Sequence, residues 1–455
     1  MGRKKIIIDT DPGIDDVLAI LLALSMPAEV EVVLLSVTFG NTDVDKSLRN
    51  LLSLLHVLQK ESEWRQRQDR KRNVELWGPN GRKPIVAVGA ATSLAGQAHD
   101  CDCFHGIDGL GGIHEKVLDL TSLPNKLAKP GWEQMPEYSP PQEWCRLFSD
   151  DGTDADKDSK SALPFEASSV DAAAEMLRIL QEHPPDTITI VALGPLTNCA
   201  LAASRDPATF LRCKELVVMG GAVHVPGNTT PFAEANIYAD AHAAALVFSL
   251  TSPDPSLTMP LSFGPASFTG PGKSVAHGQA KRRLNLTLFP LDITTTHLMH
   301  KEDYDQAMAN DLEDGSPLAR WLSMCVSALF DKVASQRRAT GGQCGSSTNT
   351  AVQLHDPLCM WYAMTSDALE WKTAIDCGWE DIRVEVIGEW TKGQTVIDGR
   401  MMVKHSQQSL GLEAGESSRN KRSWLIEGQG NKVKRIVGSP GASTFGQYLL
   451  EAIVG

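Results

Sequence analysis

Four aspartates stand close together near the start of the chain: Asp9, Asp11, Asp15 and Asp16. They follow the apolar residues 6–8 and surround Pro12-Gly13, after which a run of helix-forming residues begins. This order predicts a short strand, a tight turn and a helix. Carboxylates packed so closely repel one another, and a bound cation would relieve the repulsion. We therefore expect a site for a hard cation at the carboxyl end of this strand, where open α/β sheets bind ligands.

Each of these acids also has a simpler interpretation when it is taken by itself. Asp9 could be a hydrogen-bonding carboxylate at the end of a strand, and Asp15 and Asp16 could cap the following helix, because acidic residues favour a helix N-terminus. The group as a whole favours the cation site.

Further polar clusters follow later predicted strands. Asparagine and glutamate side chains on such loops suit ligands rich in hydroxyl groups, such as sugars. Taken singly, Asp356 before Pro357 is also a good helix cap, and His105 could be a structural loop histidine. Their joint appearance at strand ends favours a binding site. The clusters are Gly40-Asn41, the loop 104–109 with His105, residues 193–198, residues 219–236 with Met219, Asn228, Glu234 and Asn236, and His355-Asp356-Pro357.

Strand and helix patterns alternate along the chain. We expect strands at residues 30–38, 85–89, 187–193 and 216–219, and helices at 44–58, 167–181 and 239–250. This alternation predicts an α/β fold with a mostly parallel open sheet and helices on both faces. We expect one domain over residues 1–455, with inserted or mobile segments at 60–83, 114–166, 252–278 and 406–434, which are polar or rich in Pro, Gly and Ser.

Composition narrows the class of protein. A formal net charge of −13 argues against a protein that wraps nucleic acid. Nine scattered cysteines and the lack of a secretory apolar run predict a reducing, cytoplasmic location, and no stretch reaches membrane-spanning length. Cys101 and Cys103 lack the Cys-x-x-Cys spacing of a zinc site, so we interpret them as ordinary thiols.

The run from Asp9 to Asp16 resembles the N-terminal signature of the inosine–uridine-preferring nucleoside hydrolases. The later clusters at 40–41, 193–198, 219–221, 234–236 and 355–357 resemble pocket segments of that family in the same order. The resemblance implies the nucleoside hydrolase fold and hydrolysis of the N-glycosidic bond of ribonucleosides to ribose and free base, in nucleoside catabolism and in purine and pyrimidine salvage. It also implies a homodimer or homotetramer.

The resemblance further implies a role for each matching residue. One Ca²⁺ would be held by Asp11, Asp15, Asp16, Asp356 and the backbone carbonyl of Leu193. An all-oxygen ligand set agrees with the cation that the acids suggest unaided. Asp11 would take the proton of the attacking water, and His355 would face the leaving base. The residues implied to bind substrate are Asn41, His105, Met219, Asn228, Glu234 and Asn236.

Two other interpretations stay open at this point. Asp9-Thr10-Asp11 after a strand is compatible with a haloacid-dehalogenase-like phosphatase, but Gly13 stands where that class needs Thr or Val. A nucleoside- or ribose-binding protein without turnover is the other alternative, although every expected acid is present.

Overall fold

A nine-stranded sheet forms the centre of the computed structural model, in the order β10-β13-β7-β6-β5-β1-β2-β3-β4. Every pairing in it is parallel except β10 with β13. The strands are β1 (Lys4–Thr10), β2 (Val30–Val37), β3 (Ile85–Val88), β4 (Glu166–Ala167), β5 (Ile188–Ala192), β6 (Glu215–Met219), β7 (Leu286–Phe289), β10 (Lys372–Thr373) and β13 (Val433–Gly438). The expected mostly parallel, open α/β sheet is confirmed.

Two short antiparallel ladders lie outside this sheet, β8 (Leu298–His300) with β9 (Ala351–Gln353) and β11 (Arg383–Val384) with β12 (Thr395–Val396). The structure describes residues 3–68, 83–96, 104–114, 138–148, 163–260, 282–339, 350–375, 378–400, 424 and 428–454. Cys101 and Cys103 lie outside these residues. Within the described part, no helix combines the length and the apolar character needed to cross a bilayer.

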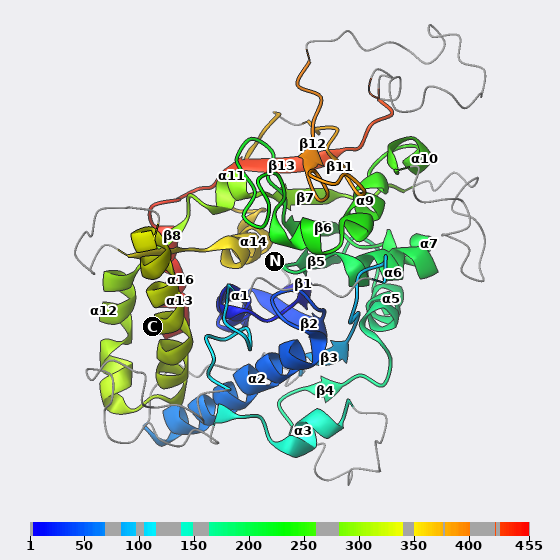
Figure 1. The fold of residues 1–455 in the computed structure, drawn as a ribbon. Helices are drawn as coiled ribbons and strands as arrows, with labels where there is room; N and C mark the ends of the chain where they lie inside the picture. Colours follow the sequence, from blue (N-terminus) through cyan, green and yellow to red (C-terminus); the bar gives the residue numbers. More distant parts are fainter. Residues whose placement is uncertain are drawn as a thin grey trace, which may run out of the picture.

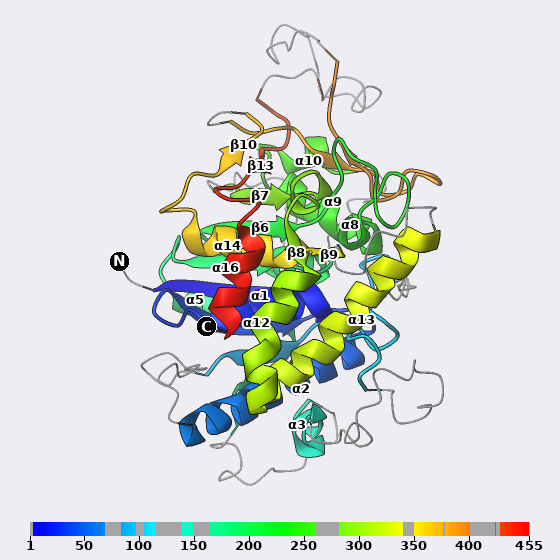
Figure 2. The same cartoon turned by 90° about the vertical axis from the view of Figure 1, so that its left-hand side faces the viewer.

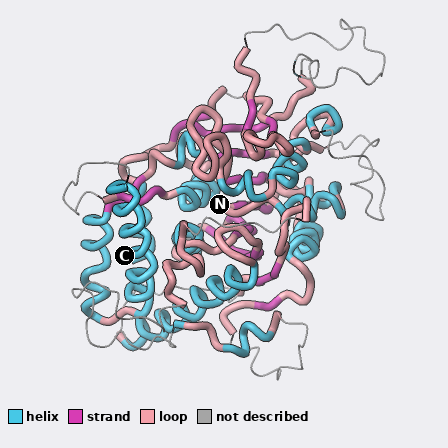
Figure 3. The backbone as a smooth tube through the Cα atoms, in the orientation of Figure 1, coloured by secondary structure: helices cyan, strands magenta, loops and turns pink. Residues whose placement is uncertain are grey.

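Helices cover both faces of the sheet (Figure 1), and Figure 3 shows the strands running between two groups of helices. Along β1, Ile6 and Ile8 pack into one core and Ile7 into the other, because successive side chains point to opposite faces. The first core is built with α1 (Ile14–Leu24), α2 (Val44–Arg67), α12 (Lys301–Asp314), α13 (Pro317–Ala339), α14 (His355–Thr365) and α16 (Phe445–Val454). The second is built with α5 (Ala172–Glu182), α6 (Thr197–Arg205), α7 (Pro207–Phe210) and α9 (Ala241–Ser249).

Helices α12, α13 and α16 stand together beside the sheet, as the two perpendicular views show (Figures 1 and 2). The remaining helices are short: α3 (Gln142–Arg146), α8 (Ala235–Ala239), α10 (Pro255–Thr258) and α11 (Leu291–Thr294). The carboxyl ends of β1, β2, β5 and β6 meet at one edge of the parallel sheet, so the loops that follow them are neighbours.

The expected insertions overlap elements that the structure describes. Helix α2 continues through Arg67, beyond the expected end at residue 58, because Glu61 is fully buried and accepts hydrogen bonds from Arg65, Ser316 and the Leu318 amide. Segment 114–166 contains α3 and the first residue of β4, segment 252–278 contains α10, and segment 406–434 contains the start of β13. The other residues of these four segments lie mainly outside the described ranges.

Candidate active site

The turn between β1 and α1 is organised by Asp16. One carboxylate oxygen of Asp16 accepts from the Thr10 hydroxyl at 2.6 Å, and the other accepts from the Gly13 amide and from Asn41 Nδ2, both at 3.0 Å. A carboxylate that binds the N-cap amide closes the first turn of the helix. Asp16 therefore fixes the geometry of the Asp11–Asp15 segment, in addition to any ligand that it binds.

Asp11 follows β1 and is almost fully buried. Its Oδ2 accepts from the Asn41 amide at 2.6 Å, whereas Oδ1 is a buried atom with no hydrogen-bond partner among the described residues. Gly40 and Gly194 stand on either side of this carboxylate, and a Cβ atom on either residue would overlap it. The two glycines leave room for the Asp11 carboxylate, and its unpartnered oxygen is suited to a cation or a water molecule.

Asp356 comes from the far end of the chain and meets the N-terminal acids. The first turn of α14 places it against α1, and ligand oxygens of Asp15, Asp16 and Asp356 lie within 4.8 Å of one another. Burial, followed by the charges of neighbouring aspartates, raises the pKa of Asp11, Asp16 and Asp356. Burial also raises the pKa of Asp15, and the nearby His355 opposes this shift.

These observations test whether a cation fits the site. Carboxylates in a buried cluster are destabilised unless a positive charge compensates them. The oxygens of Asp11, Asp15, Asp16 and Asp356 form a set that suits a hard divalent ion such as Ca²⁺ or Mg²⁺. The residues present therefore fit such an ion.

Asn236 connects the ends of β5 and β6. Its Nδ2 donates to the Leu193 carbonyl at 2.5 Å and to the Met219 carbonyl at 3.3 Å. Leu193, Met219 and Asn236 are thus brought together at the carboxyl edge of the sheet, as the sequence suggested. The Leu193 carbonyl still has a second lone pair that a ligand can use.

Glu234 has a structural role that the sequence did not suggest. It is the N-cap of α8, and its two oxygens accept from the amides of Gly221, Asn236 and Ile237 at 2.9–3.1 Å. These bonds hold the loop after β6 against α8. Asn228 is an exposed residue of that loop and accepts from the Ala235 amide at 2.9 Å. Contact of Glu234 or Asn228 with a substrate stays a prediction.

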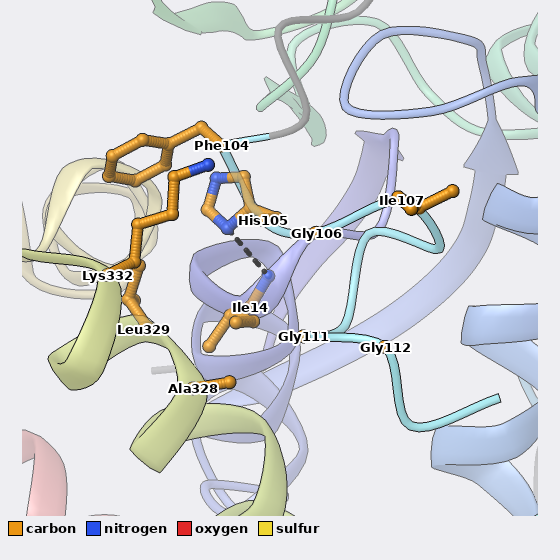
Figure 4. A pocket seen from close by; sticks show the side chains of 10 residues that line it. All are labelled: Ile14, Phe104, His105, Gly106, Ile107, Gly111, Gly112, Ala328, Leu329 and Lys332. Atoms are coloured by element: carbon orange, nitrogen blue, oxygen red, sulfur yellow. Dashed lines mark hydrogen bonds between the residues drawn. The ribbon is translucent and has the colours of Figure 1, made fainter. Parts of the chain in front are cut away.

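Two histidines lie near Asp15. His105 Nδ1 accepts from the Ile14 amide at 3.3 Å (Figure 4), so the ring proton lies on Nε2, which is 3.4 Å from Asp15 Oδ1. His355 Nδ1 is 2.7 Å from the Thr294 hydroxyl. Burial lowers the pKa of His355, and Asp15 partly offsets this effect.

Two buried asparagines hold the site together: Asn198, from the expected 193–198 cluster, and Asn50, which sequence reasoning missed. Asn50 of α2 is completely buried, and its Nδ2 donates to the carbonyls of Pro12 and Asp108 at 2.9 and 2.7 Å. It therefore ties the aspartate turn to the His105 loop. Asn198 of α6 donates to Asp9 and to the Val37 carbonyl. The only sequence signal for Asn50 was a polar residue on the apolar face of a predicted helix.

Comparison with known proteins identifies relatives over most of the chain. The family model described as inosine-uridine preferring nucleoside hydrolase matches residues 6–416. A protein named probable uridine nucleosidase 2 from Oryza sativa subsp. japonica is 35% identical over 247 residues, which are 54% of each chain. The matched region thus spans about half the length of this plant relative. Non-specific ribonucleoside hydrolase RihC from Salmonella paratyphi C is 27% identical over 426 residues, 93% of this chain and 96% of that protein.

Solved structures share the fold. A structure titled plant nucleoside hydrolase PpNRh1 enzyme has a TM-score of 0.57 at 24% identity and covers 99% of this chain and 98% of its own. A purine-preferring ribonucleoside hydrolase from Gardnerella vaginalis has a TM-score of 0.61 at 20% identity, with the same coverage. Because the family model covers nearly the whole sequence, this chain belongs to the inosine-uridine preferring nucleoside hydrolase family.

Proposed function

We propose that this protein hydrolyses the N-glycosidic bond of ribonucleosides and depends on a divalent cation, with Ca²⁺ as the expected ion. Family membership supports the reaction, and the buried cluster of Asp11, Asp15, Asp16 and Asp356 is the observation that carries the proposal. Inosine and uridine are the proposed substrates, and ribose and the free base are the products.

The proposed ligands of the cation are Asp11, Asp15, Asp16, Asp356 and the Leu193 carbonyl. When bound, the cation would neutralise the carboxylates and polarise water and ribose hydroxyls. The Asn41 and Asn236 side chains stand at the same sheet edge and can hydrogen-bond the ribose, together with Glu234, Asn228 and the Met219 segment.

The chain's own residues then account for the proton transfers. Asp11 takes a proton from the attacking water, since its Oδ1 has no other hydrogen-bond partner among the described residues. The water oxygen bonds to the anomeric carbon while the carbon–nitrogen bond breaks, and the electron pair of that bond goes to the base nitrogen. His355 is proposed to protonate the leaving base, and His105 Nε2 lies 3.4 Å from Asp15 Oδ1. The sugar passes through an oxocarbenium-like state, as in glycoside hydrolysis generally.

The phosphatase alternative conflicts with the position of Asp9. A nucleophilic aspartate must reach its substrate, but Asp9 is completely buried. Its oxygens accept hydrogen bonds from Ser36 and Asn198, with the Cys199 thiol at 3.8 Å. The first acid of the Asp-x-Asp pattern is therefore part of the framework between strands.

The decisive experiment measures ribose release from a panel of nucleosides, with calcium and with a chelator. We expect release in calcium, little release in chelator, and a loss of at least about 100-fold in the Asp11→Ala variant. Asp43→Asn is the matched control, because the exposed Asp43 side chain accepts from the Lys46 amide as a helix cap and asparagine caps equally well. Near-normal ribose release by folded Asp11→Ala would refute the role of Asp11. Tight nucleoside binding without any turnover would instead indicate a silent binding protein.

Quaternary structure and location stay predictions. A homodimer or homotetramer is proposed from family membership, and sedimentation analysis would test it. A cytoplasmic location is proposed from the scattered cysteines, and a role in nucleoside salvage from family membership.

A further inference from the structure

A cavity of about 290 Å³ lies beside the acid cluster, between α13 and the His105 loop (Figure 4). Its volume is near the lower end of the range of small-molecule sites, about 300–1,000 Å³. The walls are largely apolar and come from Ile14, Phe104, Ile107, Ala328 and Leu329. This space suits a flat aromatic ring better than a sugar with its hydroxyl groups.

His105 joins the cavity to the proposed ribose site. It lines the cavity, and its Nε2 lies 3.4 Å from Asp15 Oδ1. Ile14, which also lines the cavity, directly precedes Asp15. A nucleoside whose ribose lies at the acid cluster can therefore extend its base past His105 into this space.

Lys332 brings a positive charge to the cavity. Among the ten described residues that line it, Lys332 is the one with a permanent charge. The side chain extends from α13, and its Nζ is 5.6 Å from the centroid of the Phe104 ring. Figure 4 shows the ammonium group near the Phe104 and His105 rings. An ammonium group in a largely apolar, partly enclosed space interacts strongly with an oxygen that gains negative charge.

Cleavage of the glycosidic bond creates such an oxygen. The electron pair of the broken bond enters the base ring and is delocalised onto ring carbonyl oxygens. Resting on the proposed function, we propose that Lys332 hydrogen-bonds the carbonyl oxygen of the leaving base and makes this enzyme favour inosine over adenosine. Lys332 keeps its proton throughout, and the base receives its proton from another group. Adenosine has an amino group in place of this oxygen, so the ammonium group has no acceptor there.

The Lys332→Met variant tests this role, because methionine keeps the apolar stem and removes the charge. Steady-state rates are measured on inosine and adenosine. We expect kcat for inosine to fall about 10- to 100-fold with a smaller change in KM, because the oxygen gains its charge only in the transition state. The rate on adenosine is expected to change less than about threefold.

Lys301→Met is the matched control. Lys301 Nζ also lies over an aromatic ring, 5.7 Å from the Phe330 centroid, but it is not among the residues that line the cavity. This variant is expected to leave both rates unchanged, and Lys332→Arg is expected to restore part of the inosine rate.

An equal fall on both substrates, or no fall on inosine, would overturn the role of Lys332 and leave the proposed function intact. Absence of ribose release from every nucleoside by the unmodified protein would overturn the proposed function and this role together.

Discussion

Replacing Asp356 with asparagine tests two effects of the acid cluster separately: its repulsion in the metal-free protein and its binding of a cation. The oxygens of Asp15, Asp16 and Asp356 lie within 4.8 Å of one another. At that separation, two full charges repel by about 3 kcal/mol at an effective dielectric constant of ~20. Burial and repulsion raise the pKa of Asp356, and each proton that the cluster holds makes the real repulsion smaller. We expect Asp356→Asn to stabilise the metal-free protein by about 1–3 kcal/mol.

The same substitution should remove most of the stabilisation by calcium. A ligand at about one hundred times its dissociation constant adds about 2.7 kcal/mol to the free energy of unfolding. Asp356→Asn removes one proposed ligand and one charge, so this increment should nearly vanish. The assay is urea unfolding followed by tryptophan fluorescence at neutral pH, with calcium and with a chelator.

Asp43→Asn again serves as the control. It should change neither the free energy of unfolding of the metal-free protein nor the increment from calcium by more than about 0.5 kcal/mol. Our reasoning would be refuted if Asp356→Asn destabilised the metal-free protein, or if calcium still stabilised the variant as it does the unmodified chain. The first result would mean that other contacts of the Asp356 carboxylate outweigh its repulsion by the neighbouring acids. The second would mean that Asp356 is not needed to bind the cation.

Three further predictions concern the framework of the site. Burial lowers the pKa of His114 to about 4, below its ordinary 6.5, so the unfolded chain binds more protons between these values and stability falls as the pH drops. The His114→Gln variant should be more stable than the unmodified protein by up to about 3 kcal/mol at pH ~4 and equally stable at neutral pH. Equal pH profiles of urea unfolding for the two proteins would contradict this. Asn50→Ala leaves the carbonyls of Pro12 and Asp108 without their donor and should cost about 1–3 kcal/mol in the same assay, with slower ribose release. Glu61→Gln, in a fully buried network, should lower the free energy of unfolding by about 3 kcal/mol; a loss below about 1 kcal/mol would show that the network contributes little.

The sequence alone determined the local features of this protein. The order of apolar residues, aspartates and Pro12-Gly13 predicted β1, the turn and α1, because strand period, turn chemistry and helix capping are encoded over a few residues. Alternating strand and helix patterns predicted the parallel sheet, and parallel strands bring the loops at their carboxyl ends to one edge. The same signature indicated the family.

Only the tertiary structure decided which distant residues meet. Packing of α14 on α1 brings Asp356 to Asp15, and α13 brings Lys332 to the cavity beside His105. Glu61 looked like part of a polar insertion, yet its contacts with α13 bury it. Periodicity shows that a helix has an apolar face but does not say which partner covers it. A buried polar side chain therefore gains its role only when the chain has folded and its hydrogen-bond partners are in place.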